Sequence, residues 1–147
     1  MKLKRILVPY DGEAASEEML RLACLVAKSA RGHVIALSVI PSTGQGQPTS
    51  TEAAMPTQAV LERAERVGAL YGVEVSGIAL QAADATATVL DKAKELASGA
   101  IFMGLPRGWC AEKSAEAMQK ISEMIGQASC PILFGCLPEM QEAGPAD

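Results

Sequence analysis

Short apolar runs alternate with longer segments of helical periodicity along the chain, and this alternation restricts its fold more than any other feature. The runs are too short for helices, and the first two are each followed by a proline, so they predict strands. These strands are expected over residues 6–8, 33–40, 73–80, 100–103 and 130–134. Residues 6–8 show no polar alternation, which is typical of a strand covered by helices on both faces.

Between the predicted strands, apolar residues recur three and four positions apart, which predicts one core-facing stripe on each helix. The helices are expected over residues 13–30, 57–71, 85–97 and 114–127. Two residues are expected to cap helix starts and three glycines to follow helix ends: Ser16, Asp84, Gly32, Gly72 and Gly99. The residues of the fourth helix expected to face the core are Met118, Ile121, Met124 and Ile125.

Strict alternation of strands and helices indicates right-handed crossovers and a parallel sheet, and therefore an α/β fold. Five strands favour a doubly wound sheet in the order 3-2-1-4-5, with the first strand in the middle and helices on both faces. The weaker alternation in residues 73–80 fits a sheet edge. We expect one domain over residues 1–137 and a C-terminal tail over residues 138–147. Residues 41–56 are rich in Ser, Thr, Gly, Gln and Pro, which predicts a long functional or mobile connection.

Charge and composition exclude several classes of partner. The net charge is −4, and no basic stripe is present, which argues against binding to nucleic acid. No apolar stretch reaches the roughly 18 residues of a membrane span, and no signal peptide precedes the first strand, so we expect a soluble, cytoplasmic protein. The four cysteines have no metal-ligand spacing and are expected to be free thiols, two of them buried (Cys24 and Cys130) and two elsewhere (Cys110 and Cys136).

The turn after the first strand is the predicted functional site. Pro9 cannot continue a central ladder, and Asp11 then follows at the carboxyl end of the middle strand. In open parallel sheets, ligands bind outside the carboxyl ends of the strands, where the strand order reverses. Two interpretations of Asp11 stay open: it contacts a ligand, or it bonds its own backbone as a turn residue.

Four segments in this order, ILVPYDG, HVIALSVI, AIFMG and ASCPILFG, resemble the universal stress protein family. The resemblance covers the chain to about Gly135 and implies an adenine nucleotide alpha hydrolase-like fold with ATP or AMP as the ligand. It places Asp11 near the adenine and ribose, beside Val39 and Ile40 of the base pocket. The full set of implied site residues is Pro9, Tyr10, Asp11, Val39, Ile40, Met103, Gly104, Arg107 and Gly108.

The chain departs from the family pattern in the glycine loop that holds phosphates. Three residues separate Gly104 from Gly108, where the family has two, and Met118 and Gln119 stand where it has Gly and then Ser or Thr. A phosphate site needs exposed backbone N–H groups that the anion can approach closely, and a long apolar side chain obstructs that approach. Arg107 is an additional cation that could pair with a phosphate at the rim. The expected result is an impaired phosphate half and a retained base half.

The sequence therefore favours a universal stress protein-like regulatory or binding module with an impaired or altered nucleotide site. The alternative is a family member that binds ATP or AMP with slow or no hydrolysis. An enzyme is the least favoured, because the single histidine, His33, has no nucleophile–base motif near it. A homodimer is expected through the last strand, from Pro131 to Phe134, since an unpaired edge invites association. Trp109 and Cys110 could form a lid, but a ring packed over the sheet end is the favoured interpretation.

Overall fold

The computed structural model describes residues 3–41, 57–105 and 115–137 of the chain. Within these residues, strands and helices alternate in the order β1 (Arg5–Pro9), α1 (Ala14–Ala30), β2 (His33–Pro41), α2 (Thr57–Tyr71), β3 (Val75–Ala82), α3 (Ala85–Glu95), β4 (Ala100–Gly104), α5 (Ala115–Gln127) and β5 (Ile132–Gly135). The expectations for residues 42–56, for the loop with Arg107, Gly108, Trp109 and Cys110, and for the tail over residues 138–147 lie outside the described residues.

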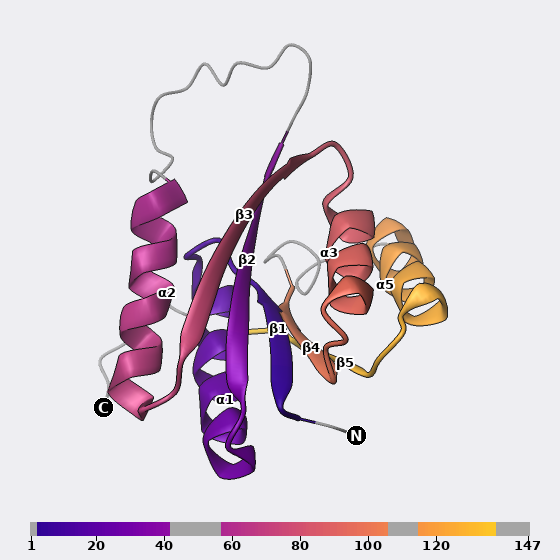
Figure 1. Ribbon diagram of the computed structural model, residues 1–147. Helices are drawn as coiled ribbons and strands as arrows, with labels where there is room; N and C mark the ends of the chain where they lie inside the picture. The colour runs from indigo at the N-terminus through magenta and orange to yellow at the C-terminus, as the bar shows by residue number, and fades with distance from the viewer. Residues whose placement is uncertain (1–2, 42–56, 106–114, 138–147) are drawn as a thin grey trace, which may run out of the picture.

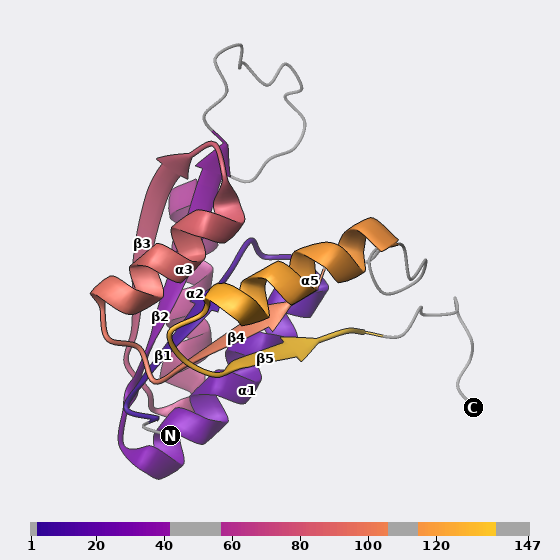
Figure 2. The ribbon, with the colours of Figure 1, turned by 90° about the vertical axis from the view of Figure 1, so that its right-hand side faces the viewer.

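All five strands are parallel and lie in the order β3-β2-β1-β4-β5, which confirms the predicted topology. In the register, Leu7 of β1 lies opposite Ile35 of β2 on one side and Ile101 of β4 on the other. Helices α1 and α2 cover one face of the sheet, and α3 and α5 cover the other (Figures 1 and 2). The first strand is therefore central, and its carboxyl end lies where the strand order reverses.

The core consists of two apolar layers, one on each side of the sheet. Successive side chains of β1 point to opposite faces, so Ile6 and Val8 enter the layer under α1 and α2, while Leu7 enters the layer under α3 and α5. All three are fully buried, as their unbroken apolar run predicts. Alanines on the helices, such as Ala23 and Ala64, are also fully buried and leave room for close helix–sheet packing.

The ends of α1 differ from the sequence prediction. Glu13 occupies the cap position without a side-chain cap bond, and Ser16 lies inside the first turn. At the other end the left-handed residue is Arg31 (φ 58°), not Gly32. Gly32 is needed there for a different reason, because a Cβ atom would lie 2.6 Å from the carbonyl oxygen of Lys4.

The other helix boundaries follow the same physics with small shifts. The Asp84 side chain accepts a hydrogen bond from the Ala87 N–H at 3.1 Å, so the predicted cap of α3 is confirmed. Gly72 has the left-handed conformation expected after α2 (φ 74°). After α3, however, Ala97 takes that conformation (φ 53°), two residues before the predicted Gly99.

The predicted inward face of α5 is confirmed at Met124 and wrong at Met118 and Ile125. Met118 and Ile125 are 57% and 60% exposed, whereas Ala117 and Met124 are buried. Ala117 and Met124 are seven residues apart and so share one face of the helix. The small side chain of Ala117 gave little hydrophobic signal in the sequence, which is why the stripe was assigned to its larger neighbours.

The cysteines also differ in part from the prediction. Cys24 is a fully buried free thiol, and Cys130 is a partly buried one. Cys136 takes part in a disulfide, so the expectation of a free thiol is wrong at this position. Within the described ranges, no helix is both long enough and apolar enough to cross a membrane.

Two helical glycines provide a matched test of the packing. A Cβ atom on Gly68 of α2 would lie 2.6 Å from the carbonyl oxygen of Val73, whereas one on Gly126 of α5 would meet nothing within 4 Å. We expect Gly68→Ala to lower the free energy of unfolding by about 1–3 kcal/mol through overpacking. Gly126→Ala should raise it by up to about 1 kcal/mol through helix propensity. Urea denaturation measures both, and a stabilising Gly68→Ala would contradict the packing of α2 on β3.

Candidate functional site

The chain that leaves β1 is fastened to β2 at two main-chain atoms. The Tyr10 N–H donates to the Leu37 carbonyl at 2.9 Å, and the buried Ser38 hydroxyl donates to the Tyr10 carbonyl at 2.8 Å. The turn then reverses at Gly12, whose φ of 85° favours glycine. The position of the next residues is therefore set by the sheet itself.

Asp11 serves the turn through one carboxylate oxygen. Its Oδ1 accepts hydrogen bonds from the Glu13 N–H at 2.8 Å and from the Ser16 hydroxyl at 2.7 Å. The Asp11 N–H lies 3.2 Å from the same hydroxyl, and Ser16 is buried. Oδ2 has no hydrogen bond to any described residue, and the side chain is exposed. Asp11 thus stabilises the turn through Oδ1, while its Oδ2 is available to a ligand.

A crevice of about 200 Å³ opens at the carboxyl ends of β1, β2 and β4. Its lining brings together six of the predicted site residues: Pro9, Tyr10, Asp11, Val39, Met103 and Gly104. Ile40 does not line it, because neighbouring residues of a strand point to opposite faces and Val39 takes the inward position. Arg107 and Gly108 lie outside the described residues.

Five lining residues were missed by the sequence reasoning. Two of them come from β2 and the α1 turn, and three from the start of α3: Leu37, Ser16, Ala85, Thr86 and Val89. Asp84 predicts from the sequence where α3 begins, but it does not predict that the start of α3 lies over the carboxyl ends of the strands. The position of α3 depends on β3 lying beside β2, which the strand order determines.

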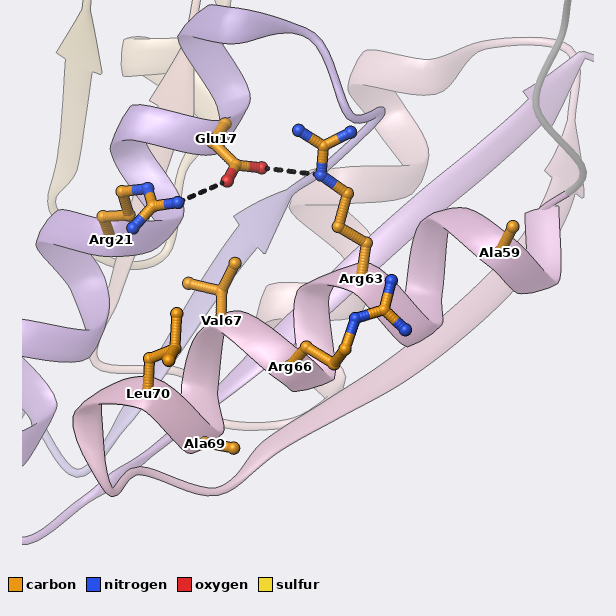
Figure 3. Close-up of a pocket in the computed structure, with 8 residues that line it drawn as sticks. All are labelled: Glu17, Arg21, Ala59, Arg63, Arg66, Val67, Ala69 and Leu70. Atoms are coloured by element: carbon orange, nitrogen blue, oxygen red, sulfur yellow. Dashed lines mark hydrogen bonds and ion pairs between the residues drawn. The ribbon is translucent and has the colours of Figure 1, made fainter.

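Tyr10 lines the crevice, but its hydroxyl is bonded elsewhere. Its side chain is 2% exposed in the layer under α1 and α2, and the hydroxyl donates to Glu17 Oε1 at 2.6 Å. Burial, together with the Glu17 hydrogen bond and charge, raises the pKa of the Tyr10 phenol. The carboxylate of Glu17 also pairs with Arg21 and Arg63, as Figure 3 shows.

Gly104 has a packing role at the end of β4. A Cβ atom there would lie 2.6 Å from the Ala15 carbonyl carbon and 2.7 Å from its oxygen. Glycine therefore lets the first turn of α1 pack directly on β4. The same close approach brings Ser16 and Asp11 to the edge of the crevice.

Met118 and Gln119 lie within α5, at its fourth and fifth residues. In an α-helix the N–H of the fifth residue bonds to the carbonyl of the first, so the Gln119 amide is used by the helix. His33 begins β2, at the opposite end of that strand from Val39 and the crevice. Residues 3–41, 57–105 and 115–137 contain no cluster of three His, Cys, Asp or Glu side chains that could hold a metal ion.

A family model described as "Universal stress protein family" matches residues 2–120. The chain belongs to the universal stress protein family. The sequence segments that resemble the family and the strand order agree with this membership. No curated protein matches the sequence.

Solved structures of universal stress proteins share the fold at low sequence identity. One in complex with cAMP has a TM-score of 0.69 at 12% identity, covering 90% of this chain and 96% of its own. One from Archaeoglobus fulgidus in complex with dAMP has a TM-score of 0.65 at 18% identity, with coverages of 88% and 94%. One from Arabidopsis thaliana with AMP bound has a TM-score of 0.63 at 12% identity, with coverages of 90% and 91%.

The raised pKa of Tyr10 gives this family member a dependence of stability on alkaline pH. An unfolded tyrosine ionises near pH 10, and the folded state holds its proton to a higher pH. The stabilisation is therefore complete below about pH 10 and falls as the pH rises above it. In a Tyr71→Phe variant, Tyr10 is the remaining tyrosine of the two in the chain.

We expect the tyrosinate absorbance of that variant to rise only as its helical circular dichroism is lost. With Tyr10→Phe added, the fall in unfolding free energy above pH 10 should become shallower. Ionisation of Tyr10 near pH 10 in the folded protein would contradict the buried bond to Glu17.

Proposed function

We propose that the crevice binds the base and ribose of an adenine nucleotide, and that the protein is a regulatory binding module that favours AMP over ATP. The observation that carries the proposal is the lining of the crevice. Apolar side chains form its walls, Asp11 provides the acidic group, and none of its lining residues is a lysine or arginine. Such a lining suits an uncharged ring and a sugar better than a chain of phosphates.

The walls support the nucleoside half of this proposal. Pro9, Val39, Val89 and Met103 offer flat or flexible apolar contacts for a purine ring. Asp11 Oδ2 is unpaired among the described residues and can accept a hydrogen bond from a ribose hydroxyl. Because Oδ1 is already held by Glu13 and Ser16, the second oxygen is oriented before a ligand arrives.

The phosphate half is less favourable in three respects. A triphosphate would add several negative charges beside the Asp11 carboxylate. Met118 and Gln119 replace the residues that the family uses for phosphate, and the Gln119 amide lies within α5. The crevice of about 200 Å³ is also smaller than the roughly 300–1,000 Å³ of ordinary ligand pockets.

The alternative is an ATP- or AMP-binding family member with slow or no hydrolysis. The structural relatives with cAMP, dAMP and AMP favour adenine nucleotides as the ligand class in both cases. The two proposals differ in the order of affinity: the first requires that the β- and γ-phosphates add nothing, and the second that they strengthen binding.

Calorimetric titration of the purified protein with AMP, ADP and ATP distinguishes them. We expect AMP to bind with a dissociation constant on the order of 0.1–1 mM and ATP to bind no more tightly. Asp11→Asn keeps an oxygen for Glu13 and Ser16 but removes the charge, and should weaken AMP binding about tenfold. Glu13→Gln, an exposed neighbour outside the crevice lining, should leave the affinity unchanged.

Tighter binding of ATP than of AMP would contradict the impaired phosphate half. The double change Met118→Gly with Gln119→Ser restores the family residues and tests where the impairment lies. If these positions are responsible, ATP should gain at least about tenfold in affinity over AMP. Circular dichroism must accompany this variant, since glycine in a helix costs about 1 kcal/mol.

We also propose that the protein forms a homodimer through β5. This strand is at the edge of the sheet, next to β4, so one side of its backbone lacks a strand neighbour within the described residues. Leu133 is 43% exposed on it and Leu137 is 37% exposed just after it. Pairing with a second β5 would satisfy the backbone groups and cover both leucines.

Light scattering after size-exclusion chromatography measures this assembly. We expect a dimer for the unmodified chain and a monomer for Leu133→Asp, because the new carboxylates would meet across the interface. Leu70→Asp on α2 introduces the same charge on a helix that covers β2 and β3, far along the sheet from β5, and should stay dimeric. A monomer at high concentration for the unmodified chain would reject the dimer.

A further inference from the structure

An open groove of about 750 Å³ lies between α1 and α2, on the opposite face of the sheet from α3 and α5. Figure 3 shows the residues that line it: Glu17, Arg21, Ala59, Arg63, Arg66, Val67, Ala69 and Leu70. This lining shares no residue with the crevice described above, and the hydrogen bond from Tyr10 to Glu17 connects the two. The groove is therefore a separate surface of the protein.

Glu17 organises the cationic part of the groove. Its Oε2 accepts from Arg21 Nη2 at 3.0 Å, and its Oε1 lies 3.4 Å from Arg63 Nε and accepts from the Tyr10 hydroxyl at 2.6 Å. The Glu17 side chain is only 12% exposed. Hydrogen bonds to Tyr71 and to Glu17 raise the pKa of Arg21. Two guanidinium groups are thus held on either side of one carboxylate, across the junction of the two helices (Figure 3).

The groove carries positive charge that its own carboxylate does not neutralise. Three arginines against one glutamate leave a net charge of +2, in a chain whose overall charge is −4. Arg63 bonds to Glu17 only through Nε, so its two terminal nitrogens have no partner among the described residues. Arg66 forms no ion pair or hydrogen bond with any described residue. The N–H groups of a guanidinium are spaced so that two of them can bond the two oxygens of one carboxylate.

The other part of the groove is apolar and ends at an exposed leucine. Leu70 is 76% exposed at the end of α2. On α2, the lining residues 59, 63, 66 and 70 recur at helical spacing on one side of the helix. They extend over three turns, or about 16 Å.

We propose that this groove binds an acidic amphipathic helix of a partner protein. Carboxylates of that helix would meet Arg21, Arg63 and Arg66, and its apolar side chains would cover Ala69 and Leu70. A helix laid in a groove between two helices is an established mode of peptide recognition, read through anchors three and four residues apart. A stripe three turns long is too extended for a single phosphate and matches about three turns of a docked helix.

The charges around the stripe favour a peptide over nucleic acid. Glu62 and Glu65 are exposed on the same helix and would repel a continuous phosphate backbone. A peptide can place its carboxylates opposite the arginines and leave the positions opposite these glutamates neutral or basic. The occupant is therefore an acidic helix with discrete charges.

Selection from a displayed peptide library on the full-length protein tests the proposal. We expect enriched peptides to carry Asp or Glu together with Leu, Ile, Met or Phe at helical spacing. The best of these, synthesised with a fluorophore, should bind at least about tenfold more weakly to Arg63→Ser/Arg66→Ser and to Leu70→Ser. Lys120→Ser on α5 removes an exposed cation elsewhere and should leave the affinity unchanged. Amide shifts on titration should lie on α1 and α2.

Three outcomes would overturn the proposal. The selected peptides could lack acidic residues, or they could bind the arginine double variant as tightly as the unmodified chain. Displacement of the peptide by millimolar inorganic phosphate would show a small-anion site in place of a helix site. An unchanged circular dichroism spectrum and urea midpoint of the double variant show that the fold is intact, so a negative result here is separate from any result at the crevice.

Discussion

The hydrogen bonds of Tyr10 are the constraint on which both the crevice and the groove depend. Its main chain is bonded to Leu37 and Ser38 of β2, and its side chain passes to the other face of the sheet and bonds to Glu17. A hydroxyl buried away from water needs such a partner, because an unpaired one would cost about 1–3 kcal/mol. Glu17 in turn fixes Arg21 and Arg63. One residue thus sets the position of Asp11 at the crevice and of the arginines in the groove.

Most of the fold could be predicted because its signals are local and repeated. The apolar run of residues 6–8 required helices on both faces, and the strict alternation of elements required a parallel sheet with this strand in the middle. The structure has that order, and Asp84 caps α3 as its residue type favours. These predictions needed only periodicity and capping chemistry, which act over a few residues.

The errors arose where a specific contact outside the helix and strand repeats decides the outcome. Ser16 has the residue type of a cap, but its hydroxyl is bonded to the Asp11 carboxylate five residues earlier. Arg31 takes the left-handed conformation that ends α1, while Gly32 passes close to Lys4, 28 residues away in the sequence. The α3 wall of the crevice depends on which strands are neighbours, and the Tyr10–Glu17 bond follows no motif. Periodicity contains none of this information.

The distribution of charge across the sheet bears on the ligand of each surface. The crevice contains Asp11 and no basic residue in its lining, whereas three arginines lie in the groove on the α1 and α2 side. The two surfaces are lined by different residues, and no arginine is among the crevice lining. The positive charges of Arg21 and Arg63 are also partly neutralised by the Glu17 carboxylate. The arginines are therefore not part of the proposed nucleotide site, and their charge acts on molecules that approach α1 and α2.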